Sequence, residues 1–220
     1  MKLFIDSADS QEIKTAWDWG IIDGVTTNPS LAAKAGRPYS EVALQILDIL
    51  GQDTYLSLEV IATDVDGIMQ QAKQLSSMDS RVVVKIPCTQ AGVQATHRLS
   101  GEGTLVNMTL VFSPAQALLA AKAGAFFVSP FVGRLDDAQE GSGNNTVAEI
   151  INIFDNYDFA SQVLYSSVRD VRHVEDAAIL GADIATVPFK VLQKLVEHPL
   201  TDKGLDKFLA DWDKAGLTLT

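Results

Sequence analysis

The sequence predicts an α/β protein that folds as a single closed (β/α)8 barrel, the TIM-barrel architecture. Eight short apolar runs, rich in Val, Ile, Leu and Phe, alternate with longer segments that carry helical signals. Strands and helices that alternate through short links favour a parallel sheet, and eight such units favour its closure into a barrel. A hydrophobic content of 47% in 220 residues is ample for a core of that kind.

The expected strands are short and apolar throughout, which is typical of strands buried on both faces. We place them at residues 3–6, 24–28, 55–60, 81–87, 104–110, 125–132, 162–167 and 183–188.

Helix start signals stand between these runs. Ser113 and Pro114 open an alanine-rich segment that Gly124 ends, with Pro at the first helical position and Gly after the last. Further candidate N-caps are Asp9 or Ser10, Thr63 or Asp64, and Asp170. The links are short enough for one continuous barrel, so residues 1–220 are expected to form one domain.

Two segments do not fit the repeating unit. Residues 133–146 are rich in turn-forming residues and are interpreted as a loop, either a surface excursion or a functional loop. Residues 202–215 follow the eighth unit and carry an apolar stripe at helical spacing, so we expect an extra C-terminal helical arm. That arm either packs on its own barrel or docks on a neighbouring subunit.

Composition excludes several classes of function. The chain has 17 basic and 28 acidic residues, a net charge of −11, which argues against nucleic-acid and membrane partners. Cys88 is the only cysteine, so the sequence offers no disulfide framework. With no signal-peptide pattern and no long apolar run, the protein is expected to be cytoplasmic. The spacing of its three histidines predicts no metal site, and no cofactor is expected.

Polar residues stand where the apolar runs end. In a barrel of this type the reactive groups lie at the carboxyl ends of the strands, so these side chains would line the mouth of one pocket. They are Asp6, Thr26, Thr27, Asn28, Glu59, Lys85, Thr109, Ser129, Ser167 and Thr186.

Lys85 is the most informative of them, because it follows three valines and lysine is rarely buried without a partner. It either pairs with a carboxylate at the barrel rim or serves as an amine nucleophile. Desolvation would lower its pKa from about 10.4, and the neutral amine would form a Schiff base with a ketone.

Imine chemistry needs acid/base groups, and Asp6 and Glu59 lie on separate strand ends, although each could instead form a structural ion pair. Thr109 could hold a water, while Asn28 and Ser129 could bind sugar hydroxyls. Asn28 could also merely hold the turn into the next helix.

Two arginines follow the sixth and seventh strands. Arg134, Arg169 and a helix N-terminus make a reasonable clamp for a sugar phosphate, although either arginine could pair with a nearby aspartate instead. Ser166 and Ser167 precede Arg169. Because successive strand residues face opposite sides, only one serine should reach the pocket, and spacing favours Ser167.

These motifs resemble the transaldolase family, in particular its short branch that also contains the fructose-6-phosphate aldolases. The similarity is carried by KLFIDSADSQEIKTAWDWGIIDGVTTNPSLAAKAG, VVVKIPCTQAGVQA and NMTLVFSPAQALLAAKAGAFFVSPFVGRLDD. It implies that Lys85 forms an imine with a ketose phosphate, that Asp6 acts on the C4 hydroxyl, and that Glu59 and Thr109 handle water. It also implies a sugar-binding set of Thr26, Asn28 and Ser129, and a phosphate-binding set of Arg134, Ser167 and Arg169.

The resemblance also separates transfer from simple cleavage. Transaldolases of this branch carry Glu and Phe where the aldolases carry Gln and Tyr, and here those positions are Glu59 and Phe131. We therefore expect a transaldolase that moves a dihydroxyacetone unit from fructose 6-phosphate or sedoheptulose 7-phosphate to an aldose phosphate, in the pentose phosphate pathway. The alternatives are a fructose-6-phosphate aldolase, a pyridoxal-type imine enzyme and a non-catalytic sugar-phosphate binder. The resemblance further implies a homo-oligomer, a decamer with exchanged C-terminal helices.

Overall fold

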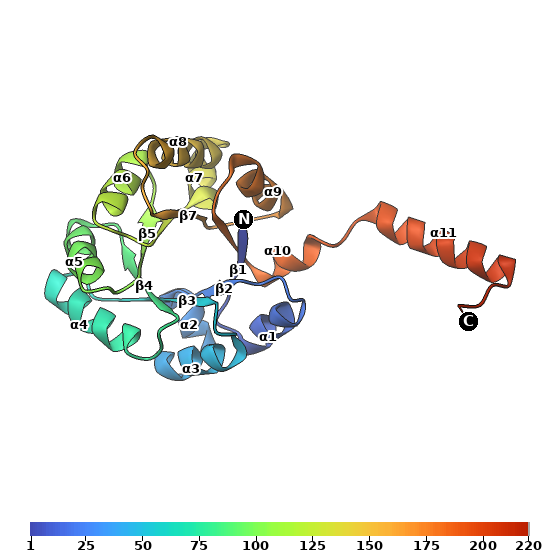
Figure 1. Ribbon diagram of the computed structural model, residues 1–220, viewed down its shortest axis with the longest axis horizontal. Helices are drawn as coiled ribbons and strands as arrows, with labels where there is room; N and C mark the ends of the chain where they lie inside the picture. Colours follow the sequence, from blue (N-terminus) through green and yellow to red (C-terminus); the bar gives the residue numbers. More distant parts are fainter. Residues whose placement is uncertain (220) are drawn as a thin grey trace.

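The computed structural model describes residues 1–219, and within them eight parallel strands close into a barrel in chain order (Figure 1). The predicted fold class is confirmed. The strands are β1 (Lys2–Asp6), β2 (Gly24–Thr26), β3 (Tyr55–Glu59), β4 (Val82–Pro87), β5 (Val106–Val111), β6 (Phe127–Pro130), β7 (Gln162–Tyr165) and β8 (Ile184–Val187).

Helices surround the strands, and the predicted capping residues Asp9, Asp64, Ser113 and Asp170 each cap one of them. The helices are α1 (Ser10–Asp18), α2 (Pro29–Ala35), α3 (Tyr39–Ile49), α4 (Val65–Ser76), α5 (Gln90–Gly101), α6 (Pro114–Lys122), α7 (Val132–Ala138), α8 (Ser142–Asn156), α9 (Val171–Leu180), α10 (Phe189–Lys194) and α11 (Pro199–Ala215). Within residues 1–219, no helix is both long enough and apolar enough to span a membrane.

The barrel interior changes from apolar to polar within two residues along several strands. An apolar layer contains the buried side chains of Phe4, Val83, Phe127, Leu164 and Ile184. Strand side chains alternate between the two faces, so the residue two positions further along points to the same interior. Those residues are polar, which places a set of polar groups directly above the apolar layer: Asp6, Lys85, Ser129, Ser166 and Thr186.

The expectation of a loop over residues 133–146 is wrong. These residues belong to α7 and the start of α8, joined by a short turn at Gly141, whose φ is 75°. The other glycines of this stretch serve close packing instead of turns. A Cβ at Gly133 would collide with the carbonyl of Ser167, and one at Gly143 would collide with Val132.

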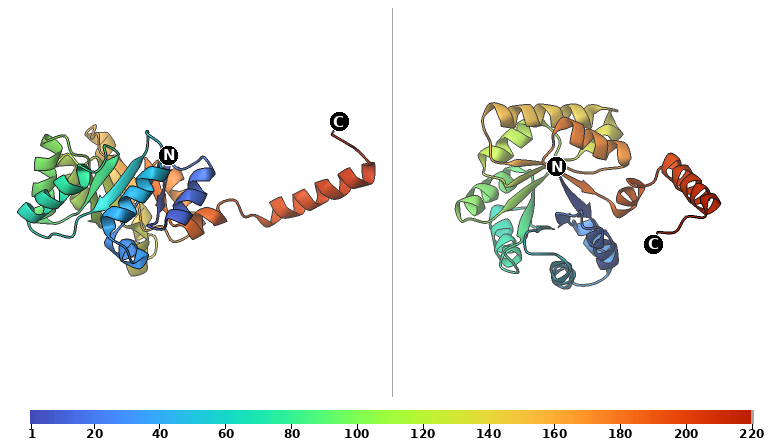
Figure 2. Two further views of the ribbon diagram at one scale, coloured as in Figure 1. Left: turned by 90° about the horizontal axis from the view of Figure 1, so that it is seen from below. Right: turned by 45° about the vertical axis from the view of Figure 1, so that its right-hand side comes forward.

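The C-terminal arm is helical, as predicted, but begins earlier, because His198 caps the helix and Pro199 occupies its first turn. Figures 1 and 2 show α11 projecting away from the barrel in every view. Among its residues, all of which the structure describes, none is buried. The alternative in which the arm packs on its own barrel is therefore excluded for this conformation, and the apolar stripe is solvent-exposed: Leu205, Phe208, Leu209 and Trp212.

Candidate active site

A cavity of about 200 Å³ opens at the carboxyl end of the barrel. It brings together most of the residues that the sequence predicted for the site, although they come from strands spread over the whole chain. Its lining consists of Asp6, Thr26, Asn28, Lys85, Ser129, Phe131, Arg134, Leu164, Ser166, Ser167, Val168, Arg169, Thr186 and Pro188. Three of the predicted residues, Thr27, Glu59 and Thr109, do not belong to this lining.

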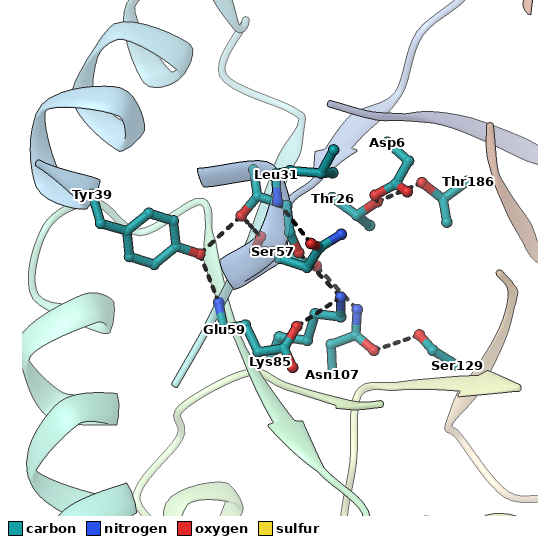
Figure 3. A network of polar contacts seen from close by, with 12 residues as sticks. Asp6, Thr26, Leu31, Tyr39, Ser57, Glu59, Lys85, Asn107, Ser129 and Thr186 are labelled. Carbon is teal, nitrogen blue, oxygen red and sulfur yellow. Dashed lines mark hydrogen bonds and ion pairs between the residues drawn. The ribbon is translucent and has the colours of Figure 1, made fainter. Parts of the chain in front are cut away.

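Lys85 is buried and its ammonium group has two partners (Figure 3). Lys85 Nζ lies 3.0 Å from Glu59 Oε2 and donates to the backbone carbonyl of Thr27 at 3.1 Å. The two strands place Glu59 directly opposite Lys85 in the register. The rim ion pair that the sequence left open is therefore present, and its carboxylate is also one of the two predicted acid/base groups.

Asp6 and Glu59 lie on opposite sides of the Lys85 ammonium group (Figure 3). Its Oδ1 accepts a hydrogen bond from Thr26 Oγ1 at 2.8 Å, and that hydroxyl also contacts Thr186 Oγ1 at 2.6 Å. Burial raises the pKa of Asp6 above 3.8, although the charge of Lys85 and the Thr26 hydrogen bond oppose that shift. Asp6 is thus a stronger base than an exposed aspartate.

Asn107 is a central residue of the site that the sequence analysis missed. It is fully buried beside Lys85 in the strand register. Asn107 Nδ2 donates to Ser57 Oγ at 3.1 Å, and Asn107 Oδ1 accepts from Ser129 Oγ at 2.6 Å (Figure 3). A signal was available, because Asn107 precedes Thr109 by two residues and shares its face of the strand.

Tyr39 was also missed, and no pattern in the sequence pointed to it, because it comes from α3 and reaches the site only through the fold. Its hydroxyl oxygen accepts the backbone N–H of Glu59 at 2.9 Å and lies 2.9 Å from Thr27 Oγ1. Thr27 Oγ1 in turn donates to Ser57 O at 3.0 Å, so the Tyr39 hydroxyl donates to Thr27. Tyr39 therefore joins the two residues that hold the Lys85 ammonium.

Thr109 is buried, and its hydroxyl contacts no polar partner in residues 1–219. The next residue, Leu110, has a φ of 55°, and the register between β5 and β6 shifts there. Such irregularities redirect side chains and are common next to active sites. A buried hydroxyl without a partner is unfavourable by about 1–3 kcal/mol, so Thr109 is available to bind a small polar molecule.

Asn28 has a structural role as well as a place in the cavity lining. It is the N-cap of α2, and its Oδ1 accepts the N–H of Leu31 at 3.0 Å. The alternative in which Asn28 holds the turn into the helix is therefore observed, and it leaves the side chain at the edge of the cavity.

Arg134 and Arg169 lie together at the mouth of the cavity. The guanidinium of Arg134 stacks over the Phe131 ring, 5.0 Å from its centroid, and Arg169 Nη2 pairs with Asp137 at 2.6 Å. Both arginines are exposed, so little rearrangement is needed for either to meet an anion. The aspartate pairing that the sequence left open is thus present for Arg169.

Both serines before Arg169 line the cavity, so the expectation that only one would reach it is wrong. The strand ends at Tyr165, and the strict alternation of side chains ends with it. Ser166 Oγ donates to Pro130 O at 2.7 Å, while Ser167 adopts a left-handed conformation with φ of 61°. A non-glycine residue in that region is strained, which is common where a ligand is held.

The fold and the cavity define an α/β-barrel enzyme whose site lies at the carboxyl ends of the strands. Comparison with known proteins then identifies the family. The family model described as transaldolase/fructose-6-phosphate aldolase matches residues 3–219. The chain belongs to this family and is an enzyme of the transaldolase type.

Individual relatives agree with this assignment over nearly their whole length. A probable transaldolase of Aquifex aeolicus is 52% identical over 214 residues, which cover 97% of each chain. Probable transaldolases of Coprothermobacter proteolyticus and Geotalea uraniireducens are 53% and 52% identical, covering 97% of this chain and 97% and 99% of their own. The predicted family resemblance is therefore confirmed.

Proposed function

We propose that this enzyme transfers a dihydroxyacetone unit from a ketose phosphate to an aldose phosphate through a Schiff base on Lys85. The donor would be fructose 6-phosphate or sedoheptulose 7-phosphate. The observation that carries the proposal is the position of the buried Lys85 amine, 3.0 Å from Glu59 and in one cavity with Asp6 and two arginines.

Imine formation requires an uncharged amine. Transfer of a proton from Lys85 Nζ to the Glu59 carboxylate frees the nitrogen lone pair, which adds to the C2 carbonyl of the ketose. The carbinolamine then loses its hydroxyl as water, with Glu59 returning the proton. The partnerless hydroxyl of buried Thr109 supports its role in holding that water.

Cleavage requires a base on the sugar's C4 hydroxyl. Asp6 takes that proton, the C3–C4 bond breaks, and its electrons move into the protonated imine to give an enamine on Lys85. From fructose 6-phosphate the aldehyde released is glyceraldehyde 3-phosphate. The enamine then attacks the acceptor aldehyde, Asp6 returns the proton to the new hydroxyl, and water hydrolyses the imine.

The remaining cavity residues suit the nonreacting part of the substrate. Thr26, Asn28 and Ser129 line the cavity and would bind the dihydroxyacetone hydroxyls, and the buried Asn107 holds the Ser129 hydroxyl in place. Arg134, Arg169 and Ser167 lie at the mouth, where two guanidinium groups favour a phosphate. The overall charge of −11 is overridden here by these local cations.

Transfer is favoured over release of free dihydroxyacetone because Glu59 and Phe131 are the residues of the transferring branch. The Phe131 ring lines the cavity and has no hydroxyl with which to hold a proton-relay water. We place the reaction in the pentose phosphate pathway.

We also propose a homo-oligomeric enzyme, a decamer in which the exposed α11 of one subunit docks on another.

The test measures glyceraldehyde 3-phosphate released from fructose 6-phosphate, with and without erythrose 4-phosphate. Sustained release that requires the acceptor is the expected result, whereas equal release without it would identify an aldolase.

Lys85→Met is expected to abolish borohydride trapping of the substrate, while Lys122→Met, an exposed control on α6, leaves it unchanged. Asp6→Asn is expected to keep trapping and to lose cleavage by at least about 10²-fold.

A further inference from the structure

We propose that His173 and Asp136 are positioning residues that fix the relative orientation of the two phosphate-binding arginines. The inference rests on the proposed function, because it takes the mouth of the cavity as the phosphate subsite. His173 lies on α9 and Asp136 on α7, and neither lines the cavity itself. They connect the turn before α9, which carries Arg169, with α7, which carries Arg134.

The two ring nitrogens of His173 contact different elements. The Arg169 backbone N–H donates to His173 Nδ1 at 3.2 Å, so Nδ1 carries no proton. The proton is therefore on Nε2, which lies 3.3 Å from Asp136 Oδ2. One imidazole ring thus accepts from the turn that bears Arg169 and lies 3.3 Å from a carboxylate on the helix that bears Arg134.

Asp136 is itself held in place from a second side. Its other oxygen, Oδ1, accepts the backbone N–H of Gly143 at 2.9 Å, which ties the end of α7 to the start of α8. The side chains of Asp136 and His173 are 20% and 13% exposed, against 63% and 51% for the neighbouring Asp137–Arg169 pair. The His173–Asp136 contact is therefore much better shielded from water than the exposed Asp137–Arg169 pair.

The two arginine-bearing elements are also in direct backbone contact. Val132 N–H donates to Ser166 O at 3.1 Å, and a Cβ at Gly133 would collide with the Ser167 carbonyl and lie 2.8 Å from Arg169 Nε. This contact fixes one point, at which the elements could still pivot. The His173–Asp136 link lies further along the chain in both elements and supplies the second point that sets their relative angle.

The spacing along each element shows why the link acts on the arginines. Arg134 precedes Asp136 by two residues, and Arg169 precedes His173 by four. Lys85, in contrast, is held by Glu59 and Thr27, which belong to other elements of the barrel. Loss of the link should therefore weaken binding of the phosphate and leave imine formation with an unphosphorylated ketose unchanged.

The experiment compares borohydride trapping by two ketoses that share the reacting carbons, fructose 6-phosphate and dihydroxyacetone. His173→Leu is expected to raise the half-saturating concentration of fructose 6-phosphate roughly tenfold, which corresponds to the loss of about one hydrogen bond. The half-saturating concentration of dihydroxyacetone should stay within about twofold of the wild-type value. In turnover, KM for fructose 6-phosphate rises and kcat does not. Asp136→Asn should act in the same direction, and the double variant should be no worse than the stronger single one.

Further variants separate positioning from folding. His173→Asn keeps an acceptor at the place of Nδ1 and is expected to recover much of the fructose 6-phosphate affinity. His97 is an exposed histidine on α5, so His97→Leu is the matched control. It should change the half-saturating concentration of neither ketose. An equal shift for both ketoses, or no shift in a folded His173→Leu protein, would overturn the proposal.

An imine-independent measurement keeps the two proposals distinct. Binding of inorganic phosphate, followed by ³¹P NMR titration, should weaken roughly tenfold in His173→Leu. If the wild type traps neither ketose, the Schiff-base proposal fails, and the phosphate titration alone decides the role of His173. Unchanged phosphate binding in that variant would refute that role whatever the trapping shows.

Discussion

Glu59 and Lys85 face each other across neighbouring strands, with Glu59 Oε2 3.0 Å from Lys85 Nζ. Glu59 lies outside the lining of the substrate cavity but beside the amine, so it can exchange a proton with Lys85 without occupying substrate space. We therefore expect the side chain at position 59 to determine whether the Lys85 nitrogen can give up a proton locally. Together with Phe131, Glu59 is expected to determine whether the dihydroxyacetone unit is transferred to an acceptor or released.

Changing Glu59→Gln and Phe131→Tyr together should shift the enzyme toward release of free dihydroxyacetone. The introduced glutamine would still reach Lys85 but could not take its proton, and the introduced tyrosine would bring a hydroxyl into the cavity. We expect the ratio of free to transferred dihydroxyacetone to rise about tenfold, which corresponds to about 1.4 kcal/mol in relative barriers. Product analysis by NMR measures the ratio. Glu102→Gln, an exposed control, should leave it unchanged, and an unchanged ratio in the double variant would reject these positions as the determinants.

Removing the Thr26 hydroxyl should move the pH profile of the enzyme. Thr26→Val removes the 2.8 Å hydrogen bond to Asp6 Oδ1, which stabilises the charged carboxylate and lowers its pKa. Without that bond the pKa of Asp6 rises further above 3.8. Activity needs the carboxylate and is lost as pH falls through that pKa, so the acid limb of kcat/KM should move to higher pH. A limb that stays in place or moves to lower pH would show that another group controls it.

Tyr39→Phe should lower both stability and turnover. The substitution keeps the ring but removes the only described acceptor of the Glu59 N–H, which costs about 1–3 kcal/mol for a buried group. For a chain of this size each kcal/mol lowers Tm by roughly 2–4 °C. Because Tyr39 also donates to Thr27, whose carbonyl holds Lys85, kcat should fall more than KM changes. Tyr157→Phe, at an exposed position, is the control for calorimetry and kinetics. An unchanged Tm would show that water replaces the lost hydroxyl.

Most of the site was predictable because a parallel barrel converts position in the chain into position in space. Once eight strands were recognised, the polar residue at each strand end had to lie at one mouth, which is why Asp6, Lys85 and Ser129 were found together. Asn107 obeys the same alternation and was missed only because the strand end drew attention to Thr109. Tyr39 obeys no such rule, because a helix residue reaches the site through tertiary packing alone.

Each of the two errors has a physical cause. Glycine can mark either a turn or a close contact between backbones, and the sequence does not separate the two. Gly133 and Gly143 serve contacts, which is why a stretch interpreted as a loop is largely helical. Likewise, both serines before Arg169 reach the cavity because the chain leaves the strand at Tyr165, a boundary that composition does not define.

The assembly is the remaining prediction, and α11 is the element that tests it. This 17-residue helix projects from the barrel with its apolar stripe exposed. An isolated helix of about this length is only marginally stable in water, so the stripe needs a covering surface, which we propose is a second copy of the chain. Phe208→Asp with Leu209→Asp should therefore dissociate the oligomer in light scattering, whereas Lys203→Glu should not. The residues proposed as catalytic all lie on strands of one barrel, so the dissociated variant should still trap dihydroxyacetone at Lys85. A wild-type protein with the mass of a single chain would contradict the proposed assembly.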